Sequence, residues 1–181
     1  MYISTLYEEK NRLRPLPLPS ELSKRIWELN RKQILLVGYE LKPIEIVLPW
    51  LIVRDAKKQL LKANRDDILG YIGFLMHDVG NTILRMLLPS IPSIMFRDPK
   101  ELEVIDHYIE FKEQKIKTRR IIATGFTIWP SEKPTISIVL TCELYDIPDE
   151  LDSYNLSRCK IIIDLRKLLE ELNIRWDIGR G

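Results

Sequence analysis

Histidines are the side chains best suited to proton transfer near neutral pH, and this sequence has only two. His77 and His107 are the histidines among 181 residues. A catalytic or metal-bound histidine needs partners at defined positions, such as a carboxylate that orients the ring. Asp106 is adjacent to His107, but adjacent residues of a helix point in different directions. The sequence also contains no phosphate-binding glycine loop and no nucleophile elbow. We therefore expect a protein that is not an enzyme, with no catalytic residue, metal or cofactor.

An acid and a base close together could serve metal-dependent cleavage of a phosphodiester. Glu110 and Lys112 form this pair in "YIEFK", and Asp98 and Asp106 lie upstream. Magnesium nucleases of the PD-(D/E)xK type use such residues around the ion, which stabilises charge on the scissile phosphate. Those enzymes hold the triplet on a strand, whereas the apolar periodicity here predicts a helix. A Mg²⁺-dependent nuclease is therefore the third of three hypotheses for this chain.

A basic stretch, "KEQKIKTRR", begins at the same lysine. Its only acid is Glu113, and its cations are Lys112, Lys115, Lys117, Arg119 and Arg120. A solvated helix face accounts for such a stretch, and contact with DNA phosphates or an acidic partner is the functional alternative. No interleaved aromatic residues indicate stacking on a single strand. A basic nucleic-acid-binding accessory protein, viral or encoded by a mobile element, is the second hypothesis.

The overall composition predicts a globular chain without membrane contact. Apolar residues make up 45% and charged residues 30%, and the formal net charge is +2. This balance supports a buried core and does not require a nucleic acid or an anionic membrane as partner. No apolar run reaches the roughly 18–20 residues of a membrane span, and no signal peptide begins the sequence. We expect a cytoplasmic protein with Cys142 and Cys159 as reduced core thiols, and the richness in Ile, Lys and Glu suggests a thermophile.

The elements that would position these side chains start with an unusual apolar stretch, "IEIVLPWLIVRDAKKQ". Residues 44–48 alternate as a strand does. Pro49 has no amide hydrogen for a sheet but suits the first turn of a helix. The sequence therefore predicts a strand that turns directly into a helix, with Trp50 filling the corner.

Three further helices are predicted from apolar periodicity: one over 20–33, one over 64–87 and one over 98–123. In the last, Asp98 is a plausible cap, Pro99 suits the first position, and two apolar stripes suggest two neighbours. The residues expected at a subunit interface are Leu102, Ile105, Tyr108, Ile109, Phe111 and Ile116. Residues 135–144 read as a strand or a helix, with a hairpin to 120–129 slightly favoured, and residues 156–174 read as a helix.

In their order along the chain, three motifs resemble the GINS subunits related to the eukaryotic second and third partner-of-Sld-five proteins. Those chains have a strand, a Leu-Pro-(Leu)-Trp-Leu-Ala segment and a basic helix. The matching residues here are Leu48, Pro49, Trp50 and Leu51, followed by Lys57 and Lys58. Lys115, Ile116 and Ala123 match a long helix of the family, and "LTCEL" at Leu140, Thr141 and Glu143 is similar to the start of a late helix.

This resemblance implies an α+β chain with a small N-terminal β-rich domain over residues 1–61 and a larger, mainly α-helical domain over residues 62–181. It also implies a structural subunit in archaeal DNA replication, bridging the MCM helicase and a RecJ-like partner. The expected partners are a sister GINS subunit in a heterotetramer, the MCM helicase, the RecJ-like protein and, by contact, DNA. The expected location is the cytoplasm, in association with the nucleoid. A GINS subunit is the first hypothesis from the sequence.

Overall fold

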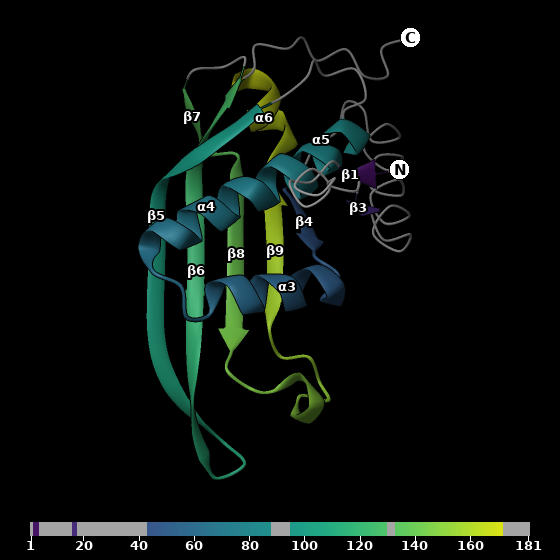
Figure 1. Ribbon diagram of the computed structural model, residues 1–181. Coiled ribbons are helices and arrows are strands. Elements are labelled where there is room, and N and C mark those ends of the chain that lie inside the picture. Colours follow the sequence, from purple (N-terminus) through teal and green to yellow (C-terminus); the bar gives the residue numbers. More distant parts are fainter. Residues whose placement is uncertain (1, 4–15, 18–42, 88–94, 130–132, 172–181) are drawn as a thin grey trace, which may run out of the picture.

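A computed structural model describes residues 2–3, 16–17, 43–87, 95–129 and 133–171. Its main feature is an antiparallel sheet crossed on one face by helices (Figure 1). The helices, including one π-helical and one 3₁₀ turn, are α3 (Trp50–Leu60), α4 (Arg65–Leu75), η1 (Met76–Gly80), α5 (Asn81–Leu87), η2 (Asp149–Leu151) and α6 (Leu165–Glu171). The strands are β1 (Tyr2–Ile3), β3 (Leu16–Pro17), β4 (Ile44–Val47), β5 (Met95–Phe111), β6 (Gln114–Trp129), β7 (Pro134–Thr135), β8 (Ile138–Tyr145) and β9 (Arg158–Ile163).

The main sheet has the order β4-β9-β8-β6-β5, with β7 paired to β6, and every neighbouring pair is antiparallel. The short strands β1 and β3 form a separate ladder. The hairpin β5–β6 is far longer than the rest of the sheet, and its end extends alone past β8 and β9 (Figure 1). We call residues 105–118 of this hairpin the arm. Among the described strands, the outermost are β4 on one side and β5, which continues along the arm, on the other.

The predicted direct passage from a strand to a helix at Pro49 is confirmed. Ile44, Ile46 and Leu48 are buried, and β4 ends before Pro49. Pro49 occupies the N-cap of α3, and its carbonyl accepts backbone bonds from Ile52 at 3.0 Å and Val53 at 3.1 Å. Trp50 is partly buried against the core. Proline thus ends a ladder and begins a helix within one residue, as its missing amide hydrogen dictates.

The predicted helix over residues 64–87 is also confirmed, as three consecutive segments. The Asn64 side chain caps it by accepting a bond from the Asp67 amide at 2.8 Å. Buried residues recur at a helical period through Ile68, Ile72 and Leu75. One π-helical turn, η1, separates α4 from α5. The helix predicted over residues 20–33 lies outside the described residues, as do residues 88–94 before β5.

The prediction of a mainly α-helical second domain is wrong. Residues 98–123, predicted as the longest helix, belong instead to the antiparallel hairpin β5–β6. Pro99 lies at an irregularity of the edge strand β5, a position that tolerates a missing amide hydrogen. Dense β-branched residues favour strands, and the apolar spacing of 3–4 residues coincided with the pattern of a helix. The chain is α+β at most, and its described part is rich in β-structure rather than helix.

The C-terminal third also departs from the helical prediction. The favoured hairpin between residues 120–129 and 135–144 is confirmed by the pairing of β6 with β8. Residues 156–174 were predicted as one helix, but among its described residues 158–163 form β9, and a helix, α6, follows over Leu165–Glu171. The run Ile161-Ile162-Ile163 explains the strand, because three consecutive β-branched residues prefer a pleated surface.

Cys142 and Cys159 are neighbours across β8 and β9 and form a disulfide, so the prediction of reduced thiols is wrong. Both residues are completely buried. A separation of 17 positions in sequence carried no signal for this pairing, which depends on the register of two strands. The bond joins the two central strands beneath α3.

One continuous apolar core lies between the helices and the sheet. It contains Ile46, Ile52 and Leu60 from the segment before residue 62 and Ile72, Ile121 and Leu140 from the segment after it. The strand β4 pairs with β9, so residues 44–47 and 158–163 share one sheet. The boundary at residue 61 stays a prediction for the chain as a whole.

Candidate functional site

The face of the sheet opposite the helices is the largest feature that packing leaves unexplained. Along β8, buried and partly exposed residues alternate without exception, and β9 continues the pattern from Cys159. Side chains of a strand alternate between its two faces, so one face is covered and the other reaches solvent. We call this solvent-reaching side the open face. In an antiparallel sheet with one face in solvent, the residues on that face are usually polar.

Aliphatic side chains occupy the centre of the open face. Val139 and Ile162 lie directly opposite each other on β8 and β9. Val47 on β4 lies opposite Lys160, and Ile122 on β6 lies opposite Thr141, so both are diagonal to the pair. Val47 is 56% exposed. Cross-strand neighbours on one face are within contact distance of each other or of a shared partner. The open face therefore carries four aliphatic side chains around its centre, and Lys160 and Thr141 lie between Val47 and Ile122.

Two ion pairs lie among and beside these aliphatic side chains. On the β4 side Lys160 lies 3.4 Å from Glu45, and toward β6 Arg120 donates to Glu143 at 2.7 Å. The hydrogen bond to Glu143 raises the pKa of Arg120 further above its usual range. The cations of the face are Arg120, Arg158 and Lys160, and its acids are Glu45, Glu101, Glu103 and Glu143. An apolar centre with a mixed polar rim is typical of protein–protein contact surfaces.

The predicted interface residues separate in the structure. Ile105, Ile109, Phe111 and Ile116 lie on the arm on the same side as the open face, and Ile109 is opposite Ile116. Tyr108 is on the other side of the arm and is 60% exposed. Leu102 is buried beneath α4. The arm thus extends the apolar character of the open face beyond the body of the sheet.

The basic stretch is distributed over two faces and a turn rather than along a helix. Arg120 lies on the open face, whereas Lys115, Lys117 and Arg119 are on the opposite side of β6. Lys112 is in the turn at the tip of the arm, above the ring of Phe111 at 5.3 Å. Lys115 is 5.0 Å above the ring of Tyr108. The cations therefore do not form one continuous basic surface.

Arg119 is engaged entirely within the fold. Its Nε and Nη2 donate to the two carboxylate oxygens of Asp106 at 2.7 and 2.9 Å. Its Nη1 donates to the carbonyls of Leu60 and Ala63, each at 2.8 Å. Lys117 adds a longer contact of 3.7 Å to the same carboxylate. The hydrogen bond from Arg119 holds the pKa of Asp106 below its usual value.

The residues considered for a nuclease do not come together around an ion site. Glu110 lies across from Lys115, Lys112 is in the turn, and Asp106 is bound to Arg119. Asp98 is near Gly73 of α4, far along β5 from the tip. His107 lies in a small depression with Thr118 and Tyr145. Within the described part of the chain, no three His, Cys, Asp or Glu residues are placed to hold a metal.

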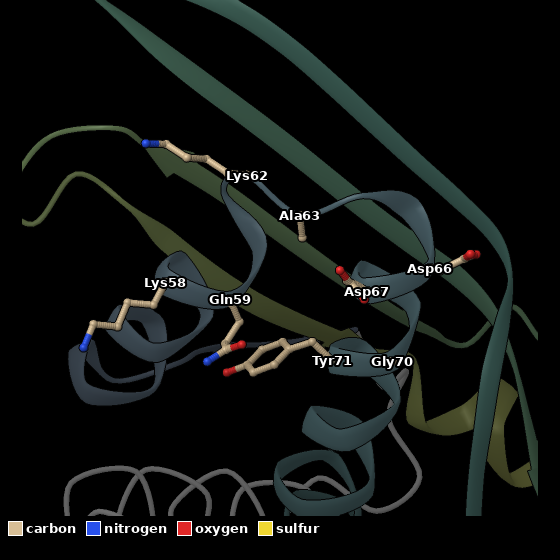
Figure 2. Close-up of a pocket in the computed structure, with 8 residues that line it drawn as sticks. All are labelled: Lys58, Gln59, Lys62, Ala63, Asp66, Asp67, Gly70 and Tyr71. Carbon is tan, nitrogen blue, oxygen red and sulfur yellow. The ribbon is translucent and has the colours of Figure 1, made fainter.

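A shallow depression of about 540 Å³ lies between the end of α3 and the start of α4. Figure 2 shows Lys58 and Lys62 on the α3 side and Asp66, Asp67 and Tyr71 on the α4 side. The Tyr71 hydroxyl is committed to Asp55, to which it donates at 2.6 Å. Opposite charges on the two walls leave no net preference for an anion or a cation. This depression carries no arrangement of nucleophile and base.

Asp78 is a buried ionisable group whose environment the sequence did not predict. It is 2% exposed in the π-helical turn η1, and neither carboxylate oxygen has a hydrogen-bond partner among the described residues. Burial raises its pKa to about 7. π-helical turns recur at functional sites, but no second group of the described chain converges on this carboxylate to define a reaction. Its measurable effect is on stability.

No family model, curated protein or solved structure matches this chain. Function must therefore be argued from the geometry of the chain itself. In the part of the chain that the structure describes, no helix has both the length and the apolar character needed to cross a membrane.

Proposed function

We propose that this protein is a non-catalytic interaction subunit that binds a protein partner through the open face and the arm. The observation that carries the proposal is the aliphatic cluster Val47, Ile122, Val139 and Ile162 on a sheet face that no described helix covers. Apolar residues on an exposed face cost solubility, and a patch bordered by polar residues marks an interaction site. Binding a partner would bury these side chains.

A protein partner fits this surface better than a nucleic acid. Binding to phosphates needs an excess of unpaired cations. On the open face the acids outnumber the cations, and Arg120 and Lys160 are already paired with Glu143 and Glu45. On the other side of the arm, Arg119 is buried in contacts with the fold. DNA contact through the basic stretch is therefore not part of the proposal.

The GINS hypothesis remains a narrower form of the same proposal. Its support is the strand-to-helix junction at Leu48–Leu51, which has the order of elements that the resemblance implies. Its other two motifs fall on strands β6 and β8, where the family has helices. A sister GINS subunit, the MCM helicase and a RecJ-like protein are accordingly the first named candidates for the partner. Nothing in the chain favours one of these three over the others.

A cytoplasmic, nucleoid-associated location and a thermophilic source belong to this narrower proposal. Disulfides are rare in cytoplasmic proteins of mesophiles and frequent in those of hyperthermophiles. The buried bond between Cys142 and Cys159 is thus compatible with the cytoplasm if the source is a hyperthermophile. Growth temperature of the source organism checks this part directly.

Site-specific photo-crosslinking in the native cell tests the proposal. A photoreactive residue is placed at Val139 or Ile162 on the open face, or at Ile109 on the arm. The matched controls carry it at Arg54 and His77, which are exposed on the helical side. We expect the same protein adduct from the three test positions and none from the controls.

The identity of the adduct, read by mass spectrometry, then separates the narrow and the broad forms. A GINS, MCM or RecJ-like protein supports the replication hypothesis, and a different protein confined to the test positions supports interaction alone. Adducts to nucleic acid, or equal labelling from the helical side, would contradict the proposal. The proposal would also be contradicted if the chain, purified after crosslinking in the cell, carried no adduct at any position.

A further inference from the structure

The outer edge of β5 offers unpaired backbone groups along the arm. Among the described strands, β5 has a partner only on the β6 side. Arg65 of α4 donates to the Leu102 carbonyl at 3.1 Å, which shows that this carbonyl points away from β6. Backbone groups alternate in direction along a strand. The amides and carbonyls of Val104, Asp106, Tyr108 and Glu110 therefore also point outward.

No described helix covers this part of the edge. Below α3 and α4 the hairpin continues alone, with its outer edge free (Figure 1). The register with β6 is unbroken from Glu101 to Phe111, so the edge is regular over this length. A long, regular and unpaired edge is a template for another strand. Upstream of Val104 the edge is closed by Arg65.

The edge sequence is complementary to itself in one antiparallel register. With the two-fold axis at His107, the apolar Ile105 of one copy lies opposite Ile109 of the other. On the other side of the arm, Asp106 lies opposite Tyr108 and Val104 opposite Glu110. Direct like-charge pairs are thus avoided, and each isoleucine gains an aliphatic neighbour across the new ladder.

The neighbouring registers place acids together. With the axis at Asp106, this residue faces its own copy, and with the axis at Tyr108, Asp106 faces Glu110. Like charges directly opposite each other destabilise a strand pair. With the axis at Ile105, the Leu102 carbonyl would have to exchange its bond to Arg65 for a bond to the second copy. Among the registers with the axis from Ile105 to Tyr108, the charges and the Arg65 contact leave the axis at His107.

We propose that two copies of this chain associate through the β5 edges of their arms, antiparallel, with a two-fold axis at His107. The pairing joins the two sheets into one, and the open faces of both copies become continuous across the junction. Ile105 and Ile109 of each copy remain on that face. The inference rests on the edge and not on the open face, so it holds or fails independently of the proposed partner.

Disulfide trapping tests both the pairing and its register. Opposed residues of a non-hydrogen-bonded antiparallel pair have Cα atoms about 4.5 Å apart, within disulfide range. The native cysteines are already bonded to each other, so no free thiol competes. Under mild oxidation, His107→Cys should give a covalent dimer on a non-reducing gel.

The matched control is Glu101→Cys, on the same strand and face and also exposed. In the proposed register the two copies of residue 101 are about 40 Å apart, so this variant should stay monomeric on the gel. Equal trapping of both variants would mean random collision and would contradict the register. Absence of trapping at His107 would contradict the pairing.

A backbone variant tests the same interface without added thiols. Tyr108→Pro removes an outward amide hydrogen, which the pairing with β6 does not use, so the fold should survive. Tyr108→Ala keeps the amide and serves as the control. By analytical ultracentrifugation we expect wild type and Tyr108→Ala to dimerise and Tyr108→Pro to weaken the dimer by about tenfold or more.

Wild type that sediments as a monomer at high concentration would overturn the inference, as would Tyr108→Pro with an unchanged dimer. Circular dichroism of Tyr108→Pro checks that the sheet is intact. If the dimer fails but the crosslinks of the open face succeed, the interaction proposal stands alone. The opposite result would leave a homodimer without the proposed partner.

Discussion

Asp106 and Arg119 form a bidentate ion pair that also holds the end of a helix. Nε and Nη2 of Arg119 donate to the carboxylate at 2.7 and 2.9 Å. Nη1 donates to the carbonyl of Leu60, the last residue of α3, and to that of Ala63, which follows the helix. The base of the arm and the end of α3 are therefore joined through one guanidinium. Arg119 is 8% exposed, so its loss leaves these acceptors without a replacement.

We expect Arg119→Ala to lower the free energy of unfolding by about 3 kcal/mol, toward the lower end for a broken buried pair because Asp106 is partly exposed. Chemical denaturation measures this change. Arg120→Ala, one residue later, removes an exposed, solvent-screened pair with Glu143 and should cost much less. Similar losses of stability in the two variants would show that the contacts of Arg119 with Asp106 and α3 do not stabilise the fold as described.

The same pair predicts a loss of stability in acid. Since its bond to Arg119 depresses the pKa of Asp106 in the folded chain, the carboxylate contributes stability above its unfolded pKa of 3.8. That contribution disappears as the pH falls through the depressed folded value. Asp106→Asn should therefore reduce the difference in melting temperature between pH 6 and pH 2, which thermal melts at the two values can measure.

Asp78 predicts a pH dependence of the opposite sign. Its pKa rises from 3.8 to about 7 on folding, so the folded chain binds a proton between these values and the unfolded chain does not. Stability from this group is complete below about pH 4 and decreases as the pH rises to about 7, by up to about 4 kcal/mol. Asp78→Asn removes this slope.

Thermal melts of wild type and Asp78→Asn at pH 5 and pH 8 provide the measurement. The variant should gain most at pH 8, because the buried charge is then absent. Asp66→Asn, an exposed acid in the first turn of α4, is the control and should leave the slope unchanged. Parallel curves for wild type and Asp78→Asn would show that Asp78 does not titrate as described.

Two residues in the turn at the tip of the arm have an unfavourable backbone conformation that substitution can relieve. Lys112 and Glu113 have φ values of 50° and 63°, and a left-handed backbone is unfavourable for residues with a side chain. The favoured sequence for such a two-residue turn is Asn-Gly. Replacing Lys112 by Asn and Glu113 by Gly should raise the stability by about 1 kcal/mol or more, as measured by denaturation. Gln114→Gly, placed in the strand, should lower it instead.

Trp50 tests the corner between β4 and α3. The side chain is partly buried against the core, so Trp50→Ala should cost about 2 kcal/mol, less than the roughly 3–5 kcal/mol of a fully buried aromatic residue. Leu51→Ala is the control, because Leu51 is 62% exposed in the same turn. A near-zero loss for Trp50 would place its ring in solvent.

Local chemistry predicted some elements correctly. Pro49 ended a strand and began a helix because it lacks an amide hydrogen, and Asn64 began α4 because its side chain accepts a backbone bond. The same reasoning failed at the arm. Its turn is Lys112-Glu113, which has no glycine, asparagine or proline to signal a hairpin, and its isoleucines recur at helical spacing.

The sequence by itself determined the helix starts at Pro49 and Asn64 and the supply of β-branched residues for a sheet, and it favoured a strand over a helix at residues 135–144 without deciding between them. Only the tertiary structure decided which strands pair. That pairing buries Arg119 against Asp106, brings Cys142 to Cys159 and gathers Val47, Ile122, Val139 and Ile162 on one open face. Such contacts join residues far apart in the chain, and their register depends on the packing of the whole sheet rather than on local preference.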